Sequence, residues 1–424
     1  MAMVTDSTAG APPRLARRAV VSLIDQAWLS LLNLALGLLL IRLTAKETYG
    51  TYAQLYVAGL FAASMAEALI TNPLTTLAAG SPPERRAELI AHLSRFQGQL
   101  STCVAVLLGL GSAAAVWYTG LASPILLGLV FAAYVKTSAL REFRRSVLFL
   151  HHEPRKVLGV DWIFGLITVV GTAVLVGLGW LTLPSVFAVL ALANLLALSG
   201  QPRVPAAREP TAYRQAVRDA WRRGRLALAG ATLAWTVNYS YLYLAAIWLG
   251  AAASADLNAT RLLLMPISLS VVAWSRVTRP AFGVHLVRGE WRTLRQLVAV
   301  SAAGLTALTG IYGLALWWSL PWLGAHVLGE QYLHTHTLVA GWSIYFTLNG
   351  LRIIYSSVLI AKDRYGYLLM VTGLSALTLL AIIGFAIPHY GTLGAVVALI
   401  MVEALSLLLI WAAYRFFFGR PQDP

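Results

Sequence analysis

Apolar runs of about 20 residues recur along almost the whole chain, and a helix of that length spans the hydrocarbon core of a bilayer. The composition agrees, because 58% of the 424 residues are hydrophobic and only 12% are charged, against about 25% in soluble domains. We therefore expect an all-α, polytopic membrane protein. The twelve predicted spans are residues 20–43, 50–78, 98–118, 124–149, 157–180, 183–200, 225–249, 256–283, 297–318, 336–361, 365–387 and 391–416.

The spans divide into two lobes of six helices, residues 20–200 and 225–416, flanked by tails at 1–19 and 417–424. The linker 201–224 is rich in Pro and Arg at its start and becomes a basic amphipathic helix. That helix carries Arg214, Arg218, Arg222 and Arg225. Two interpretations stand: a solvated segment lying on the anionic leaflet, or a functional contact.

Positive charge is distributed unevenly between the two sides of the predicted bundle. Most of the 32 lysines and arginines fall in the tails, the linker and the loops of one side, which the positive-inside rule makes cytoplasmic. Both termini are then cytoplasmic, and the net charge of +15 reflects topology, so no nucleic-acid partner is expected. The first apolar run is long enough to be a retained span, and the single Cys103 excludes an intramolecular disulfide.

Two of the spans share a polar stripe at identical spacing. Tyr134, Ser138, Arg141 and Arg145 correspond, 211 positions later, to Tyr345, Asn349, Arg352 and Ser356. Spacings of 3 and 4 place each set on one helix face, and an intramembrane arginine normally faces a protein interior or a water-filled cavity. We predict lobes related by a pseudo-two-fold axis along the membrane normal, with Arg141 and Arg352 facing each other. The alternative is a chance match in a biased composition.

Further polar residues are candidates for the cavity lining. Gln26 and Asn33 share one face of the first span, and Asn238 and Tyr239 lie in the seventh, where they fit either sugar contacts or an interface belt. Asp25 and Glu67 are ion-coupling candidates, since a buried carboxylate can carry a proton. The alternatives for Asp25 are a salt bridge to a neighbouring arginine and a position at the wet end of the helix.

Cationic and histidine-containing positions complete the candidates. Lys136 lies within the fourth span, and Arg261 opens the eighth, where it can meet a phosphate or pair with Asp256. His151-His152-Glu153 and the pair His334 and His336 lack a complementary cluster, so no metal site is expected. The sequence has no phosphate loop, nucleophile elbow or acid pair at catalytic spacing, and we expect neither a cofactor nor an enzyme.

Three short segments lie where helices begin. Glu47–Ala53 opens the second span, Leu328–Tyr332 precedes the tenth, and Tyr390–Ala395, followed by Glu403, opens the twelfth; Pro280 and Gly289-Glu290 follow the eighth. Each signal is weak alone, because Gly and Tyr are common at helix ends. Together and in this order they resemble the polysaccharide transporter branch of the multidrug/oligosaccharidyl-lipid/polysaccharide (MOP) exporter superfamily, along essentially the whole chain.

The resemblance implies a flippase that works by alternating access in the bacterial cytoplasmic membrane. Its substrate would be undecaprenyl-diphosphate-linked oligosaccharide, moved from the inner to the outer leaflet for O-antigen lipopolysaccharide, exopolysaccharide or capsule. A cationic cavity would bind the diphosphate through Arg141, Arg352, Arg261 and Lys136. Sugars would meet Tyr134, Tyr345, Asn349, Asn238, Tyr239, Gln26 and Asn33.

The expected partners are this lipid, membrane lipids, and the polymerase and chain-length proteins of polysaccharide synthesis; the protein is expected to be a monomer. Three alternatives stand beside the flippase. They are a multidrug or cation antiporter of the same superfamily, a membrane-embedded polysaccharide polymerase or ligase, and a scaffold subunit of a polysaccharide synthase.

Overall fold

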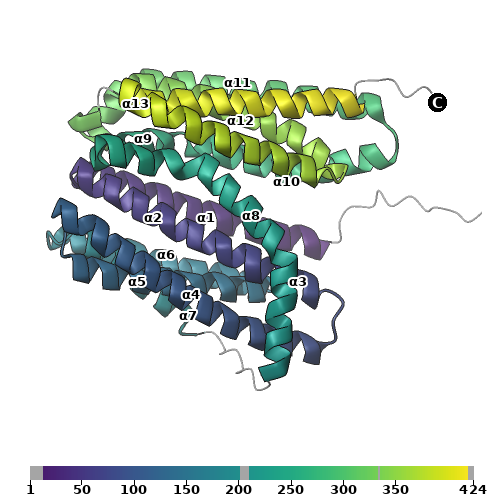
Figure 1. Ribbon diagram of the computed structural model, residues 1–424, viewed down its shortest axis with the longest axis horizontal. Helices are drawn as coiled ribbons and strands as arrows, with labels where there is room; N and C mark the ends of the chain where they lie inside the picture. Colours follow the sequence, from purple (N-terminus) through teal and green to yellow (C-terminus); the bar gives the residue numbers. More distant parts are fainter. Residues whose placement is uncertain (1–12, 201–209, 333–334, 419–424) are drawn as a thin grey trace, which may run out of the picture. The chain divides into compact units, whose positions relative to one another are not determined.

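The computed structural model describes residues 13–200, 210–332 and 335–418, which form helices and no strand (Figure 1). The remaining parts of the predicted tails and linker, with His334, lie outside the described residues. The described chain divides into two compact units. Unit 1 takes the chain up to Leu36 and Ala58–Leu228, and unit 2 takes Gly37–Val57 and the chain from Ala229. Residues 37–57, which we placed in the first predicted lobe, thus group by their contacts with unit 2.

Unit 1 is built mainly from helices that begin at proline. It contains parts of α1 (Pro13–Leu43), α2 (Lys46–Ala66) and α8 (Pro210–Leu249), together with the π-helix η1 (Glu67–Thr71), α3 (Asn72–Ala78), α4 (Pro83–Thr119), α5 (Pro124–Leu150), α6 (Pro154–Gly177) and α7 (Leu183–Leu198). Proline suits the first helical turn, because its fixed φ is helical and its missing N–H needs no partner there. α5 packs on α4 and α7.

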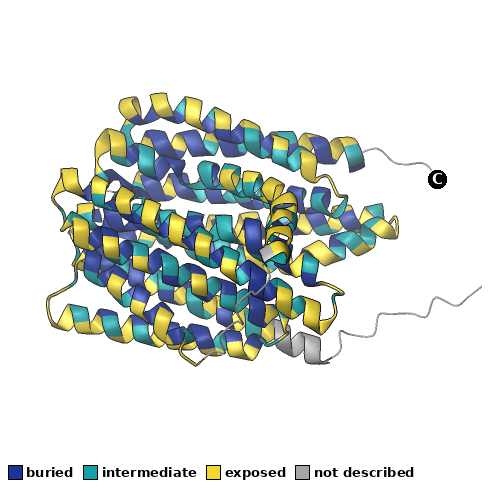
Figure 2. Ribbon diagram, turned by 60° about the horizontal axis from the view of Figure 1, so that its bottom comes forward, coloured by how far each residue is buried: buried dark blue, intermediate teal, exposed yellow. Residues whose placement is uncertain are grey.

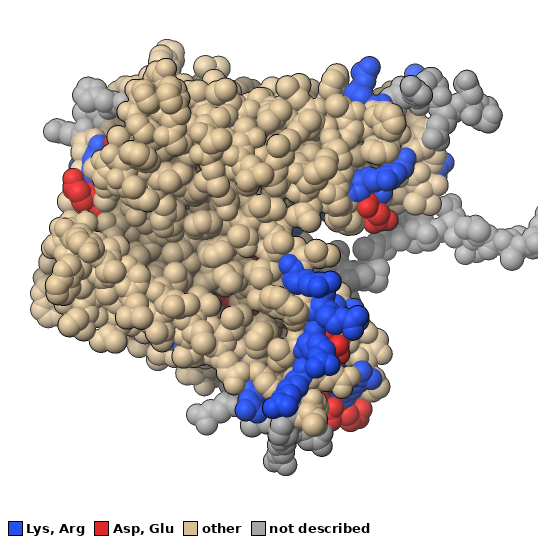
Figure 3. All heavy atoms as spheres, viewed as in Figure 1, with Lys and Arg blue, Asp and Glu red and all other residues tan. Residues whose placement is uncertain are grey.

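The basic segment predicted in the linker is not a separate helix where it is described. It forms the first half of α8, which continues into the predicted seventh span without a break. Ala216, Ala220 and Gly224 are buried on one face, while Arg214, Arg218, Arg222 and Arg225 are exposed on the other. Figure 3 shows lysines and arginines gathered at the end of unit 1 where α8 begins.

Unit 2 contains the rest of α1, α2 and α8, then α9 (Ala251–Leu263), α10 (Met265–Val287), α11 (Trp291–Leu323), the π-helix η2 (Gly324–Leu328), the 3₁₀ helix η3 (Glu330–Tyr332), α12 (His336–Ala361) and α13 (Tyr365–Phe418). α9 and α10 meet at a bend of 49°. α13 packs along α12 and is interrupted at Gly391, whose φ of 61° and ψ of −145° leave the helical region.

All twelve predicted spans fall on helical segments, but the count of twelve is not established. Eight helices of the described chain are long and apolar enough to cross a membrane, or nine if the bent pair α9 and α10 counts as one span. Two predicted spans lie within α13, on either side of Gly391. α7 has only 16 residues, and α8 carries its basic first half.

Large apolar side chains are common on the exposed helix faces, as expected of a multi-pass membrane protein. Leu107, Leu110 and Trp117 on α4 and Leu314 and Trp318 on α11 are all largely exposed. Figure 2 shows exposed and buried faces alternating along the helices. Such a surface suits lipid, whereas in water it would form an unusually large apolar patch.

Gly50 tests the packing of unit 2. A Cβ at this position would lie 1.9 Å from the carbonyl oxygen of Ala251 at the start of α9. We expect Gly50→Ala to lower the free energy of unfolding by about 1–3 kcal/mol, since neither backbone can yield cheaply. The matched control is Gly111→Ala, where a Cβ meets no atom within 4 Å. Thermal unfolding of the purified variants measures the difference, and equal melting temperatures would contradict this packing.

Candidate functional site

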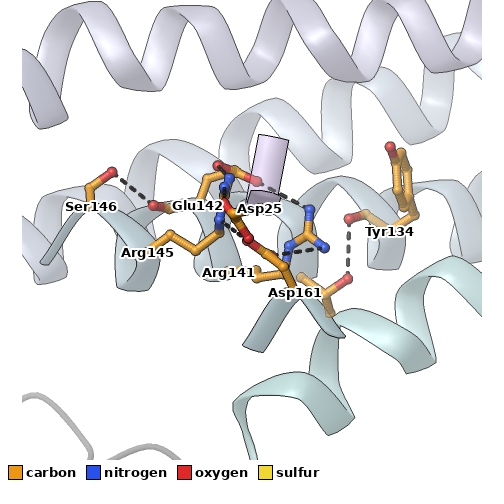
Figure 4. Close-up of polar contacts among 8 residues, drawn as sticks. Asp25, Tyr134, Arg141, Glu142, Arg145, Ser146 and Asp161 are labelled. Carbon is orange, nitrogen blue, oxygen red and sulfur yellow. Dashed lines mark hydrogen bonds and ion pairs between the residues drawn. The ribbon is translucent and has the colours of Figure 1, made fainter. Parts of the chain in front are cut away.

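Unit 1 holds a buried cluster of five charged residues: Asp25 of α1, Arg141, Glu142 and Arg145 of α5, and Asp161 of α6 (Figure 4). Arg145 lies at its centre. Its Nε is 2.7 Å from Asp161 Oδ2, its Nη1 is 2.7 Å from Glu142 Oε2, and its Nη2 is 3.1 Å from Asp25 Oδ2. The salt bridge that was one of the alternative interpretations of Asp25 is therefore present.

Arg141 lies one helical turn before Arg145 and joins the same cluster. Its Nη2 is 3.1 Å from Glu142 Oε1 and its Nη1 is 3.8 Å from Asp161 Oδ1, while the guanidinium lies 3.6 Å from the ring centre of Phe164. Trp28 fixes α6 beside it by donating its indole N–H to the Asp161 carbonyl at 3.0 Å. The cluster contains three carboxylates and two guanidinium groups, so the charge of Arg141 is already matched within unit 1.

Unit 2 holds a cavity of about 240 Å³ between α8, α10, α12 and α13. Its charged lining residues are Arg279, Arg352 and Glu403. Its neutral polar residues are Asn238, Ser356, Thr372, Ser375 and Ser406, and its apolar wall is Ala234, Val237, Ile353, Ile360, Leu368, Val371 and Ile410. The cavity thus joins two cations and one anion to hydroxyl groups and an apolar surface.

Contacts within unit 2 orient these polar groups. Arg352 Nε donates to Glu403 Oε1, to which Asn349 Nδ2 also donates at 3.1 Å. Arg279 Nε donates to Ser357 Oγ at 3.1 Å. Ser375 and Ser406 share a hydrogen bond of 2.6 Å. Two arginines that line one cavity, each held at one nitrogen, can bind an oxyanion by charge-assisted hydrogen bonds.

Arg261 is surrounded by aromatic rings and neutral oxygen atoms. Its Nη1 donates to the Asn238 carbonyl at 2.6 Å and to the Tyr241 hydroxyl at 3.0 Å, and the guanidinium lies 5.0 Å from the ring centre of Tyr239. Asp256, the partner that the sequence offered for Arg261, instead pairs with Lys46 at 2.7 Å. The structure also brings Tyr345 to 3.5 Å from Asn238 Oδ1, so this group borders the residues of the cavity.

The other predicted site residues belong to unit 1 and are not among the five residues of its charged cluster. Lys136 Nζ donates to neighbouring α4, at 2.5 Å to the Gly98 carbonyl and 2.7 Å to Thr102 Oγ1. Tyr134 is buried against Phe131 and Phe187. Asn33 is half-buried, while Gln26 and Glu67 are exposed.

Sequence reasoning missed three charged residues of these sites. Asp161 is the one acidic residue within the apolar run 157–180. A lone carboxylate in an apolar run could have identified it from the sequence as a candidate site residue. Glu142 follows Arg141 directly. Arg279 lies next to Pro280 at a predicted helix end and was counted as a topological charge, so only the contact with Ser357 identifies it as a cavity residue. The described residues contain no group of three side chains suited to a metal ion.

Asp161 tests the electrostatics of the unit 1 cluster. Its side chain is fully buried, with 0% exposure, whereas that of Glu142 is 38% exposed. We expect Asp161→Asn to reduce the free energy of unfolding by about 1–3 kcal/mol, because it removes the buried ion pairs that Asp161 makes with Arg145 and Arg141. The matched control, Glu142→Gln, should cost ~1 kcal/mol or less. Thermal unfolding in lipid nanodiscs compares them, and similar losses would show that the cluster is screened by water.

Comparison with known proteins connects this geometry to transporters. No family model and no curated protein matches the sequence. Among solved structures, the chain resembles an inward-facing MATE family multidrug resistance transporter of the MOP superfamily, at 12% identity over 92% of this chain and 94% of that one, with a TM-score of 0.71. It resembles the lipid II flippase MurJ in an inward closed conformation at 11% identity, over 94% and 87% of the two chains, with a TM-score of 0.73. A MOP superfamily transporter from Pyrococcus furiosus, described by the reverse polarity of its binding pocket, matches at 12% identity over 97% and 96%, with a TM-score of 0.64. The chain therefore has the fold of the MOP superfamily transporters.

Proposed function

We propose that this chain is a flippase for undecaprenyl-diphosphate-linked oligosaccharide in the bacterial cytoplasmic membrane. It moves the lipid from the inner to the outer leaflet by alternating access, and so serves the synthesis of O-antigen, exopolysaccharide or capsule. The observation that carries the proposal is the unit 2 cavity, in which Arg279 and Arg352 lie beside hydroxyl groups and an apolar wall.

The chemistry of the cavity suits a diphosphate headgroup. Guanidinium groups bind phosphate oxygens in a fixed, planar geometry, and they stay charged in an apolar environment. The hydrogen bonds of Arg279 to Ser357 and of Arg352 to Glu403 hold both groups before a ligand enters. Asn238, Ser356 and Thr372 add neutral donors and acceptors, which suit sugar hydroxyls.

In this proposal the diphosphate does not bind the pair Arg141 and Arg352, which the shared polar stripe predicted. Arg141 has Glu142 and Asp161 as counter-ions within unit 1, so its field on an anion is largely cancelled. Arg352 has Glu403 alone, and Arg279 lies with it on the cavity wall. We therefore assign the diphosphate to Arg279 and Arg352, with Arg261 as a nearby cation for the oligosaccharide end.

The structural neighbours support transport over catalysis. They are MATE family transporters, a transporter described by a reversed pocket polarity, and a lipid II flippase. One of these neighbours, the lipid II flippase MurJ, is named for a lipid cargo, and a lipid-linked substrate is what we propose here.

A cation or multidrug antiporter is the second candidate function. The observation that favours it is the unit 1 cluster, in which Asp25, Glu142 and Asp161 exceed Arg141 and Arg145 by one charge. An excess of buried carboxylate suits a cationic substrate or ion. The two functions therefore depend on different units and can be tested separately.

Diphosphate binding is tested with variants of α10 and α12. We expect Arg279→Ala and Arg352→Ala each to weaken binding of an undecaprenyl-diphosphate oligosaccharide by about 10- to 100-fold, the loss of one or two charge-assisted hydrogen bonds. Arg352→Lys should retain part of the affinity, because charge remains while the planar fork is lost. The matched control is Arg276→Ala on α10, which removes an arginine that is exposed, as Arg279 is, but does not line the cavity. Equal losses in Arg276→Ala and Arg279→Ala would contradict the site.

The substrate class is tested in a host from which the flippase gene has been deleted. We expect the wild-type chain to restore surface polysaccharide and Arg352→Ala to restore little, at equal protein levels, since transport needs the diphosphate site. The sensitivity of the same strains to cationic drugs is measured in parallel. Drug resistance conferred without restoration of polysaccharide would replace the flippase by the antiporter.

A further inference from the structure

Glu403 is the one carboxylate among the residues that line the unit 2 cavity. It belongs to the second half of α13 and is only 2% exposed. Its Oε1 accepts hydrogen bonds from Arg352 Nε and from Asn349 Nδ2, which lie three residues apart on α12. Glu403 therefore occupies, on Arg352, the position that an anionic ligand would take.

The surroundings of Glu403 contain few other charges. Arg352 of α12 donates to it, and Arg279 lies on the cavity wall contributed by α10. Tyr345 of α12 and Arg261 of α9 both contact Asn238, which also lines the cavity. α8 presents the uncharged Asn238 to the cavity, and α13 itself adds the hydroxyl groups of Ser375 and Ser406. Because arginine keeps its proton and tyrosine is neutral near pH 7, Glu403 is the group of this set that can change its charge.

The charge balance of the cavity changes when a diphosphate diester enters. With Glu403 ionised, two arginines and one carboxylate sum to one positive charge, and the diester brings two negative charges. The loaded cavity would then carry a net negative charge, and the buried carboxylate of Glu403 would have lost its guanidinium partner to the phosphate. An unpaired buried carboxylate is strongly disfavoured in its charged form.

We infer that the diphosphate displaces Glu403 from Arg352 and that the displaced carboxylate takes up one proton from water. The O–H bond forms on Glu403, the buffer supplies the proton, and no covalent bond of the lipid changes. When the lipid leaves, the ion pair re-forms and the proton is released. This inference rests on the proposed function, and it makes Glu403 a positioning residue that links substrate occupancy to protonation.

Calorimetry on the purified full-length protein tests the inference. The probe is a short-chain prenyl diphosphate ester of a single sugar, because a diphosphate diester keeps both charges near neutrality. Binding is measured at about pH 7 in two buffers that differ in their heat of ionisation, so the difference gives the number of protons exchanged. We expect about one proton taken up by the wild-type chain.

Glu403→Gln keeps the size and hydrogen-bonding capacity of the side chain but cannot titrate. We expect it to bind the probe at least as tightly as the wild type at about pH 8, with no proton uptake. The wild-type affinity should fall by up to about tenfold per pH unit as the pH rises, and that of Glu403→Gln should stay level. Glu88→Gln, which removes an exposed carboxylate of α4 in unit 1, is the matched control and should behave as the wild type.

The possible results separate the inference from the function on which it rests. Wild-type binding without proton uptake overturns the role of Glu403 and leaves the flippase proposal standing. Proton uptake that persists in Glu403→Gln also overturns it, since another group then carries the proton. Absence of any binding of the probe by the wild type overturns the diphosphate site and this inference together. The wild-type measurement decides the matter even if Glu403→Gln does not fold.

Discussion

The energetic cost of a charge in an apolar helix bundle governs how this chain places its polar residues. An unpaired buried charge costs several kcal/mol or more, so each buried arginine needs a partner within reach. Arg145 has three carboxylates around it, Arg352 has Glu403, and Arg261 has aromatic rings and neutral oxygens. The helices bearing these residues are therefore held together by electrostatics as well as by packing.

The two units satisfy this requirement differently, although α5 and α12 share a polar stripe. In the unit 1 cluster three carboxylates face two guanidinium groups, so Arg141 belongs to a closed network. In unit 2 one carboxylate serves Arg352 while Arg279 stands beside it on a cavity wall. An anion can compete with Glu403 for Arg352, whereas at Arg141 it would also have to overcome two carboxylates. This difference in charge is our reason for proposing the substrate site in unit 2.

The motifs that suggested an exporter have backbone and packing roles. Gly50 in the segment Glu47–Ala53 lets α2 approach α9 to a distance that any Cβ would prevent, and the adjacent Tyr49 is buried and accepts a hydrogen bond from Asn258. Gly391 interrupts α13 with a positive φ. These positions specify helix packing and helix breaks, so they predicted the fold. Gly50, Tyr49 and Gly391 do not line the cavity, so they could not identify the substrate; Glu403, which follows the last of these segments, does line it.

The sequence by itself determined an all-helical membrane protein, the positions of its helices and the paired stripes, because these depend on hydrophobicity and on spacing along one helix. It also made the salt bridge of Asp25 one of three options. Only the tertiary structure decided that Arg145 pairs with Asp25 and also with Asp161. It also decided that Asp256 pairs with Lys46 rather than with Arg261. Arg279 and Arg352 are likewise brought to one cavity only by the packing of their helices. Those contacts join residues of different helices, and the partner of a buried charge depends on which helix faces pack together.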